Sequence, residues 1–175
     1  SEDIVKRWAS GRRFFNAYGP TEATVWSTVA EISATGEKPL IGRPIANTQI
    51  YILDKHLQPL PIGIPGELYI SGEGLARGYF NRPELTETQF IQETEFLPRT
   101  RLYKTGDLAR YRSDGNIEFI ARIDNQIKIR GFRIELGEIE TVLREHQSVQ
   151  ETVVIAQENV SGEKHLVAYI VPNPK

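Results

Sequence analysis

The chain has 175 residues, a net charge of −2 and a pI near 6.0, which is enough length for one domain with a core, or slightly more. This charge gives no electrostatic case for binding nucleic acid or an anionic membrane, and the absence of cysteine rules out disulfides and thiolate metal sites. The three histidines show no metal-ligand spacing, no apolar run approaches the roughly 18 residues of a membrane span, and no signal peptide opens the sequence. We therefore expect a cytoplasmic protein.

The first part of the chain predicts a helix followed by two short strands. Apolar positions in residues 1–13 fall on one helical face, and Gly11 is a plausible stop. Residues 14–18 (FFNAY) and 24–32 (TVWSTVAEI) are typical of strands because they are rich in aromatic and β-branched side chains. The heptapeptide NAYGPTE, residues 16–22, joins the two strands.

This heptapeptide brings together groups that suit a nucleotide. The Asn16 amide can pair with a nucleobase edge, and the Tyr18 ring offers a face for stacking. The Gly-Pro turn would present the Thr21 hydroxyl and the Glu22 carboxylate from a rigid loop. Those two groups suit a phosphate oxygen and its Mg²⁺, which takes only one or two protein carboxylates. An ordinary turn with a solvated Thr-Glu pair explains the heptapeptide equally well.

Residues 39–80 are β-rich and punctuated by glycine and proline. The clearest strands are residues 48–53 and 67–71, and such short strands indicate a small barrel or a folded sheet. The segment GEGLARG, residues 72–78, has G-x-G-x-x-x-G spacing and lacks the helix of a dinucleotide fingerprint, so we interpret it as a structural turn. A short helix over residues 83–90 follows.

Residues 102–122 predict a β-hairpin. The dipeptide Asp114-Gly115 favours a two-residue type I′ turn, and carrying that register outward places Asp107 directly opposite Arg122 on one face. The facing pair is either a cross-strand salt bridge or a polar clamp, since a carboxylate can accept hydrogen bonds from both hydroxyls of a ribose. Both interpretations remain open at this point.

A compact α+β unit begins at Asp124. Its apolar residues predict a helix from Leu136, with Ile139 and Leu143 on the same face. Alternation predicts strands over four ranges: residues 126–130, 132–134, 151–157 and 165–171. The whole chain is therefore predicted to be α+β and β-rich, with its boundary at Asp124.

The motifs NAYGPTE, YKTGD and ARIDNQIKIRGFRIELGEIE together resemble the adenylation domain of nonribosomal peptide synthetases, which belongs with acyl-CoA synthetases and firefly luciferase among the adenylate-forming enzymes. The resemblance covers essentially the whole chain. It implies that residues 1–123 are the C-terminal part of the large AMP-binding subdomain, with a β-barrel-like layer and a sheet edge. Residues 124–175 would be the small α+β C-terminal subdomain, incomplete, joined at a hinge near Asp124.

The resemblance also implies residue roles. Thr21 and Glu22 would be catalytic, with Glu22 holding Mg²⁺. The ATP-binding residues would be Asn16, Ala17, Tyr18, Thr21, Asp107, Phe119 and Arg122. In that site Asn16, Tyr18 and Phe119 would meet adenine, Thr21 would meet phosphate, and Asp107 with Arg122 would bind the ribose.

Three further residues, Ala17, Val25 and Trp26, would line an amino-acid pocket, although Trp26 could instead be a strand residue packed in the core. Asp124 matches the hinge of the family. The basic residues that follow it would lie on a hairpin that swings toward the active site, or would form a solvated basic face: Lys128, Arg130 and Arg133.

The function implied by the resemblance is amino-acid activation. The full domain would form aminoacyl-AMP from an amino acid and ATP, and would then load the phosphopantetheine thiol of a peptidyl-carrier domain. The remaining partners would be the rest of the adenylation domain and neighbouring synthetase domains. The alternatives are an acyl- or aryl-CoA synthetase type of ligase, or a non-catalytic interaction module. Because the family's glycine-rich phosphate loop, most of its pocket and its near-terminal lysine are absent from the sequence, we expect the isolated chain to be inactive.

Overall fold

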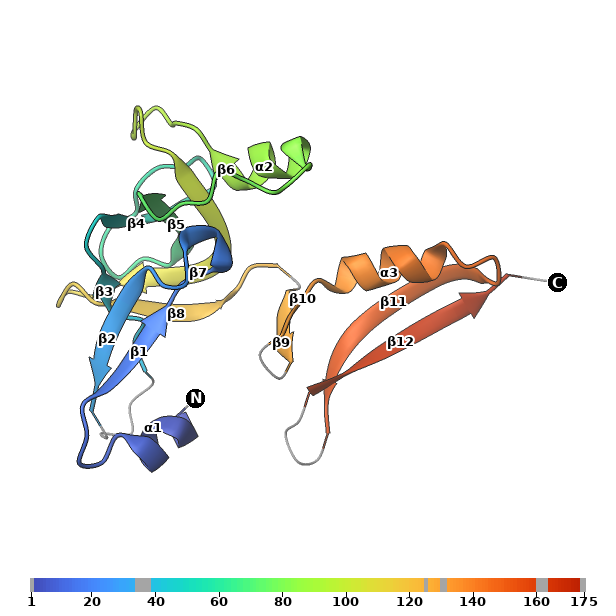
Figure 1. The fold of residues 1–175 in the computed structure, drawn as a ribbon, viewed down its shortest axis with the longest axis horizontal. Helices are drawn as coiled ribbons and strands as arrows, with labels where there is room; N and C mark the ends of the chain where they lie inside the picture. Colours follow the sequence, from blue (N-terminus) through green and yellow to red (C-terminus); the bar gives the residue numbers. More distant parts are fainter. Residues whose placement is uncertain (1, 34–38, 125, 130–131, 160–163, 174–175) are drawn as a thin grey trace. The chain divides into compact units, whose positions relative to one another are not determined.

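The structure, a computed structural model, describes residues 2–33, 39–124, 126–129, 132–159 and 164–173. Contacts within the chain separate it into two compact units, Ser1–Ile123 (unit 1) and Asp124–Lys175 (unit 2). Strands predominate in both, which confirms the predicted β-rich α+β class (Figure 1). Among the described residues, no helix has the length and apolar content needed to cross a bilayer.

Unit 1 is built mainly from strands. Its helices are α1 (Glu2–Trp8), the 3₁₀ helix η1 (Thr21–Ala23) and α2 (Pro83–Gln89). Its strands are β1 (Phe14–Tyr18), β2 (Thr28–Ile32), β3 (Arg43–Pro44), β4 (Thr48–Leu53), β5 (Gly66–Gly72), β6 (Phe90–Ile91), β7 (Leu102–Tyr111) and β8 (Ile117–Arg122). One sheet has the order β1-β2-β3, and the other has the order β4-β5-β7-β6 with β8 paired to β7.

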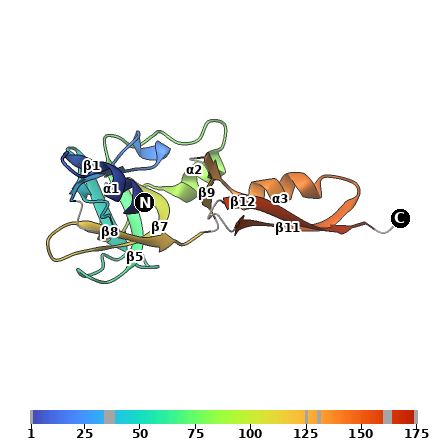
Figure 2. The same ribbon diagram turned by 90° about the horizontal axis from the view of Figure 1, so that it is seen from below.

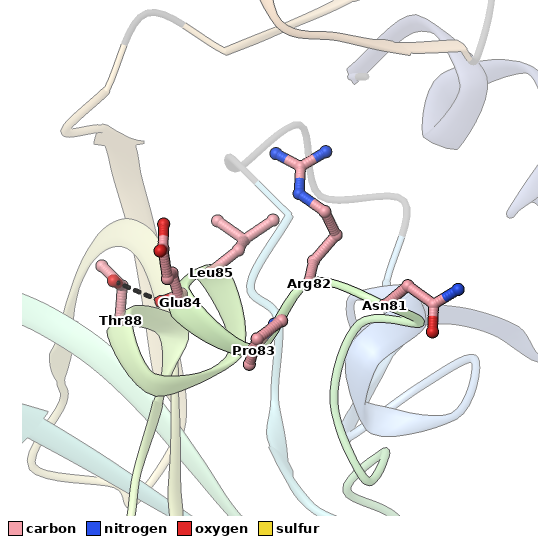
Figure 3. Close-up of a pocket in the computed structure, with 6 residues that line it drawn as sticks. All are labelled: Asn81, Arg82, Pro83, Glu84, Leu85 and Thr88. Atoms are coloured by element: carbon pink, nitrogen blue, oxygen red, sulfur yellow. Dashed lines mark hydrogen bonds between the residues drawn. The ribbon is translucent and has the colours of Figure 1, made fainter.

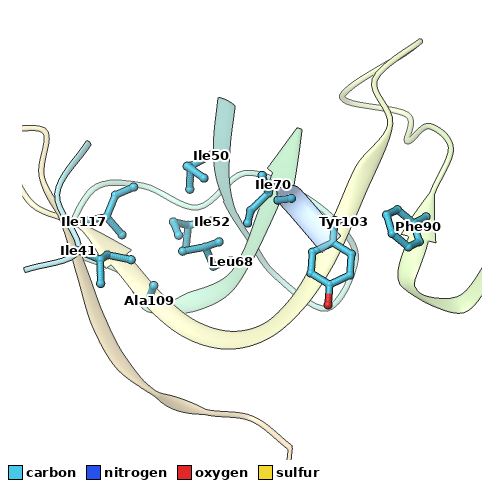
Figure 4. Close-up of a cluster of buried hydrophobic side chains, with 10 residues drawn as sticks. Ile41, Ile50, Ile52, Leu68, Ile70, Phe90, Tyr103, Ala109 and Ile117 are labelled. Carbon is cyan, nitrogen blue, oxygen red and sulfur yellow. The ribbon is translucent and has the colours of Figure 1, made fainter. Parts of the chain in front are cut away.

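The main core cluster of unit 1 lies on one face of the larger sheet, and a smaller buried cluster of Leu53, Tyr69 and Leu102 lies on the other face. Ile50 and Ile52 of β4, and Leu68 and Ile70 of β5, are two residues apart and point to the same side, as the period of a strand requires. Figure 4 shows β7 curving around this cluster and bringing Tyr103 close to Phe90. The first residues of β7 pair with β6, and its last residues pair with β8.

The hairpin loop between β7 and β8 differs from the predicted two-residue turn. The Arg112 N–H donates to the Asn116 carbonyl (2.8 Å), which leaves residues 113–115 as a three-residue loop. Gly115 has a φ of 81°, whereas Asp114 is not among the described residues with positive φ, so the turn is not type I′. Instead, the Asp114 carboxylate accepts the Asn116 N–H (3.0 Å) and stabilises the wider loop. The predicted turn is therefore wrong.

A second irregularity restores the predicted pairing further along the hairpin. A register shift lies between Leu108 and Ala109 of β7. Two pairs mark it: Ala109 with Phe119, then Leu108 with Ala121. The extra residue in β8 offsets the longer loop, so Asp107 pairs with Arg122 as predicted. The predicted facing pair is confirmed, although the register argument that led to it is not.

The second predicted strand begins later than expected. It was predicted over residues 24–32, but β2 starts at Thr28. Thr24 and Val25 have φ of 54° and 72°, and the Trp26 N–H donates to the Thr24 carbonyl (2.9 Å) in a tight turn. Composition favoured a strand there, but this turn directly after η1 prevents β pairing.

Unit 2 is a helix on a two-stranded hairpin, preceded by a smaller hairpin. Its elements are β9 (Ile127–Ile129), β10 (Phe132–Ile134), α3 (Leu136–Arg144), β11 (Val149–Glu158) and β12 (Lys164–Pro172). Figure 2 shows α3 lying along one face of the β11–β12 pair. On β11, Thr152 and Val154 are buried, whereas Val153 between them is 57% exposed. Arg130 and the side chains of Lys128 and Arg133 lie outside the described residues, so their predicted basic face has no structural description.

Candidate nucleotide site

A buried ion pair joins β7 to β8. Asp107 is 5% exposed, and its Oδ1 accepts a hydrogen bond from Arg122 Nη1 at 2.9 Å. Its Oδ2 accepts a hydrogen bond from the hydroxyl of Tyr18, at the end of β1. The Asp107 N–H donates to Thr105 Oγ1 (3.0 Å), which in turn donates to the Leu68 carbonyl (2.7 Å). Three strands therefore hold this carboxylate in place.

Burial keeps Tyr18 a neutral donor in this cluster. Desolvation raises the pKa of Tyr18 well above its usual value, and the negative charge of Asp107 raises it further. A carboxylate has about four acceptor positions. The bonds from Tyr18 and Arg122 therefore leave Asp107 with capacity to accept ribose hydroxyls. The cluster combines a salt bridge with the chemistry of a polar clamp.

The residues predicted to meet adenine lie on β1 and β8, the strands that bring Tyr18 and Arg122 to Asp107. Tyr18 and Phe119 are both half-buried and pack partly against the core of unit 1. The Asn16 amide donates to the Leu40 carbonyl (2.7 Å). Tyr18 was predicted only as a stacking surface, and its bond to Asp107 was missed because strand pairing alone does not bring β1 to β7.

The Glu22 carboxylate lies on η1 and is also buried. Glu22 is 7% exposed, and its Oε1 accepts a hydrogen bond from the hydroxyl of Tyr79 (2.6 Å). Burial is the main cause that raises the pKa of Tyr79 above its usual value, and the hydrogen bond to Glu22 is the next cause. The neighbouring Thr21 is exposed. The Glu22 carboxylate is thus buried beside the exposed Thr21, whereas the sequence predicted that the turn would present both groups.

The Glu22 carboxylate fits a magnesium ion only when nucleotide phosphates supply further ligands. Within the described ranges, no group of three or more His, Cys, Asp and Glu side chains could hold a metal ion. Mg²⁺ commonly binds through one or two carboxylates together with substrate phosphates. Glu22 supplies one such carboxylate, so the fit is to a metal–phosphate complex and not to an ion held by protein alone.

The three residues predicted for the amino-acid pocket are all exposed. Val25 is 79% exposed and Trp26 is 45% exposed, so the alternative that Trp26 is a core strand residue is wrong. A Cβ added at Gly19 would lie 2.4 Å from the Trp26 Cα, which shows how closely the two turns approach. The glycine therefore lets the Trp26 backbone lie beside the end of β1, the strand that carries Ala17.

The sequence also predicted that residues 72–78 are a structural turn. They form no regular element beyond the end of β5, which agrees with that interpretation. The prediction missed their contact with η1, where the Ala76 N–H donates to the Glu22 carbonyl (2.8 Å). No spacing rule pairs these segments, which are about fifty residues apart.

An open surface hollow of about 510 Å³ lies at the start of α2 (Figure 3). The residues that line it are Asn81, Arg82, Pro83, Glu84, Leu85 and Thr88. None of the predicted site residues is among them. The hollow therefore does not take part in the candidate site.

Comparison with known proteins identifies the family. Residues 1–80 match the family described as AMP-binding enzyme. The chain is 60% identical over 171 residues to a linear gramicidin synthase of Brevibacillus parabrevis, a match that covers 98% of the chain and 3% of that protein. It superimposes with a TM-score of 0.83 and 30% identity on PA1221, an NRPS protein containing adenylation and PCP domains, covering 99% of the chain and 36% of that protein. The chain belongs to the adenylation domains of nonribosomal peptide synthetases.

A second solved adenylation domain supports this assignment. The chain superimposes with a TM-score of 0.83 and 30% identity on Vibrio cholerae AlmE in complex with glycyl-adenosine-5′-phosphate, a match that covers 97% of the chain and 33% of AlmE. The chain therefore spans about a third of each of these two solved adenylation-domain proteins. The predicted family is confirmed, whereas the roles of individual site residues stay predictions.

Proposed function

We propose that this chain is the C-terminal part of an adenylation domain that forms aminoacyl-AMP from an amino acid and ATP. The observation that carries the proposal is the buried Asp107 carboxylate, fixed by Arg122 and by Tyr18 from the NAYGPTE motif. A carboxylate held in this way can accept both ribose hydroxyls without a further entropic cost of ordering its side chain. The match to gramicidin synthase supports the amino-acid branch over acyl- or aryl-CoA ligases and over a non-catalytic module.

The adenine and phosphates would extend from this ribose position along β1 and η1. In this arrangement the rings of Tyr18 and Phe119 contact the base, and the Asn16 amide lies near its edge. Thr21 donates its hydroxyl to a phosphate oxygen, and Glu22 directs its carboxylate to Mg²⁺. When bound, Mg²⁺ would offset the negative charge that builds on the phosphate oxygens during attack at the α-phosphorus.

The substrate and partners follow from the same family assignment. Ala17, Val25 and Trp26 would form part of the amino-acid pocket, with Trp26 as a large wall. The second partner would be a carrier domain whose phosphopantetheine thiol receives the acyl group. PA1221 contains a PCP domain together with its adenylation domain, which supports this choice.

The two units would correspond to two subdomains. We assign unit 1 to the large AMP-binding subdomain and unit 2 to the small C-terminal subdomain, with the hinge at Asp124. The division of contacts at residues 123 and 124 supports this assignment. Asp124 Oδ1 accepts the Gln126 N–H (3.1 Å), so the side chain organises the first turn of unit 2.

Amino-acid-dependent exchange of labelled pyrophosphate into ATP tests the proposal. The complete adenylation domain should catalyse exchange with one or a few amino acids, and Glu22→Ala should abolish most of it. The isolated chain should show none, because positioning of the reactants can contribute roughly 7–11 kcal/mol to the barrier and needs groups beyond these residues. Exchange by a complete domain that is indifferent to every amino acid but responds to an aryl or fatty acid would overturn the substrate assignment.

A further inference from the structure

The segment of residues 72–79 is fastened to the turn that carries Glu22. The Ala76 N–H donates to the Glu22 carbonyl (2.8 Å), and Thr24 Oγ1 donates to the Gly74 carbonyl (2.7 Å). The third bond reaches the side chain itself, from the Tyr79 hydroxyl to Glu22 Oε1 (2.6 Å). Both the backbone and the carboxylate of Glu22 are therefore held by one segment.

Tyr79 is rigid enough to fix the carboxylate that it contacts. Its N–H donates to Thr86 Oγ1 (2.9 Å), and its ring meets Phe90 edge to face at 5.7 Å between centroids. Phe90 is 1% exposed. Both ends of Tyr79 are thus anchored, the backbone to α2 through the Thr86 side chain and the ring to the core. An anchored donor restricts the rotamers of a long glutamate side chain.

Arg101 holds the residues of this segment that precede Tyr79. The Arg101 guanidinium donates to the carbonyls of Ala76 (2.6 Å) and Arg77 (2.8 Å) and lies 4.4 Å from the Phe90 ring centroid. Gly78 has a φ of 150°, and a Cβ there would lie 2.4 Å from the Thr86 side chain. Glycine is therefore needed for Tyr79 to reach both Thr86 and Glu22.

We propose that Tyr79 is a positioning residue that orients the Glu22 carboxylate toward a magnesium–nucleotide complex, an inference that rests on the proposed function. Groups that hydrogen-bond a metal-ligating carboxylate set its direction, and removing them typically costs about 10–100-fold in metal affinity or activity. Tyr79 itself makes no contact with metal or substrate in this arrangement. The competing explanation is that the bond only stabilises η1.

Metal binding separates the two explanations more directly than turnover does. The experiment uses the complete adenylation domain with ATP present and the amino acid omitted. Mn²⁺ replaces Mg²⁺ as a paramagnetic probe, and free Mn²⁺ is followed by electron paramagnetic resonance. We expect Tyr79→Phe to weaken Mn²⁺ binding by about tenfold or more. In pyrophosphate exchange the same variant should need about tenfold more Mg²⁺ yet keep kcat within about twofold at saturating Mg²⁺.

A matched control is Tyr69→Phe, which removes another tyrosine-to-carboxylate bond of unit 1, from Tyr69 to Glu67 (3.0 Å). We expect it to leave Mn²⁺ binding unchanged. Thr86→Val is the second variant, because it removes the anchor of the Tyr79 N–H while it keeps the Tyr79 hydroxyl and the shape of the Thr86 side chain. It should weaken Mn²⁺ binding in the same direction but less. If Tyr79→Phe folds poorly, this milder change still tests the inference.

Three outcomes decide the matter. Weaker Mn²⁺ binding in Tyr79→Phe and Thr86→Val, with Tyr69→Phe like the parent, supports the positioning role. Unchanged Mn²⁺ binding in both variants, while Glu22→Ala loses it, overturns that role and leaves the proposed function standing. Unchanged Mn²⁺ binding and exchange in Glu22→Ala would instead overturn the metal assignment of the proposed function.

Discussion

Unit 1 and unit 2 differ in how completely their strands are buried. Leu68, Leu102 and Ile117 in unit 1 are 0% exposed. In unit 2 every described residue of β12 remains at least partly exposed, and on β11 only Thr152 and Val154 are buried. A curved five-stranded sheet can enclose a core, whereas one helix on a two-stranded hairpin covers a single row of side chains.

One ion pair from each unit shows the same difference in burial. The Asp107–Arg122 pair of unit 1 has side chains that are 8% and 25% exposed. In unit 2 the Glu140–Arg144 pair has side chains that are 22% and 51% exposed. Burial makes the first pair sensitive to loss of either partner, because the remaining charge would be left without compensation. The residues proposed for nucleotide binding thus lie in the unit that can hold charges rigidly.

The largest expected effect comes from removing a core side chain of unit 1. Leu68→Ala should lower the free energy of unfolding by about 2–5 kcal/mol, because it removes buried methyl groups and leaves a cavity. Val153→Ala in unit 2, at a side chain that is 57% exposed, should change it by only about 0.5 kcal/mol.

Denaturant unfolding can follow the units separately. Both tryptophans, Trp8 and Trp26, belong to unit 1, so tryptophan fluorescence reports that unit, while far-ultraviolet circular dichroism reports both. A loss of similar size in the two variants would contradict the difference in burial on which the comparison rests.

The second expected effect is on ATP use. In the complete domain, Asp107→Ala should raise the KM for ATP by about tenfold or more with a smaller change in kcat, because ribose contacts persist through the reaction. Initial rates of pyrophosphate exchange at varied ATP measure both parameters. The matched control is Glu118→Ala, which removes the Arg110–Glu118 pair (2.9 Å) from the same hairpin. An equal KM in the two variants would mean that Asp107 is only a structural partner of Arg122.

The third expected effect is loss of stability of unit 1 at alkaline pH. Burial is the first cause that raises the pKa of Tyr18 and of Tyr79. Below the unfolded pKa of about 10, both states keep the proton and the full stability is present. As the pH rises above that value, the unfolded state releases protons that the folded state retains, so stability falls.

This pH effect can be measured by fluorescence-detected unfolding from about pH 8 to pH 11. Tyr79→Phe should flatten the alkaline decline, because it removes one of the tyrosines with a raised pKa. Tyr169→Phe, at a position in unit 2 that is 59% exposed, serves as the control. An unaltered slope in Tyr79→Phe would contradict a buried, protonated hydroxyl at Glu22.

The sequence predicted the site better where chemistry was local than where chain segments meet. NAYGPTE was placed correctly at the end of a strand and in the turn after it, although the 3₁₀ helix η1 was not predicted, and Asp107 was paired correctly with Arg122. The predicted pairing was correct only because two features that were not predicted, a longer loop and a bulge, offset each other. Neither is visible in alternation, because an extra residue in a strand changes the register without changing composition.

The contacts made by tyrosine hydroxyls could not be predicted from spacing. Tyr18 reaches Asp107 across 89 positions, and Tyr79 reaches Glu22 across 57. Each of these hydrogen bonds depends on how the fold of unit 1 brings distant segments of the chain together. The segment of residues 72–78 was correctly predicted as a turn, yet its place beside Glu22 follows only from tertiary packing. Local patterns therefore indicated which residues to propose for the site, and the fold shows which side chains contact them.

The smallest expected effect concerns the boundary between the two units. If Asp124 is a hinge, its backbone needs two conformations, and proline would restrict φ to near −65°. Asp124→Pro in the complete domain should therefore slow transfer to the carrier thiol several-fold more than it slows adenylate formation. Pyrophosphate exchange measures the first half-reaction, and radiolabelled amino acid on the carrier domain measures the second.

Asp124→Ala is the control for this last test, because it removes the side-chain bond to the Gln126 N–H but leaves the backbone free. It should affect the two half-reactions alike and weakly. Equal loss of both reactions in Asp124→Pro would indicate misfolding of the boundary. Equal loss confined to thiol transfer in both variants would assign the effect to the Asp124 carboxylate and its turn. A loss of transfer in Asp124→Pro alone would locate the required freedom in the backbone between unit 1 and unit 2.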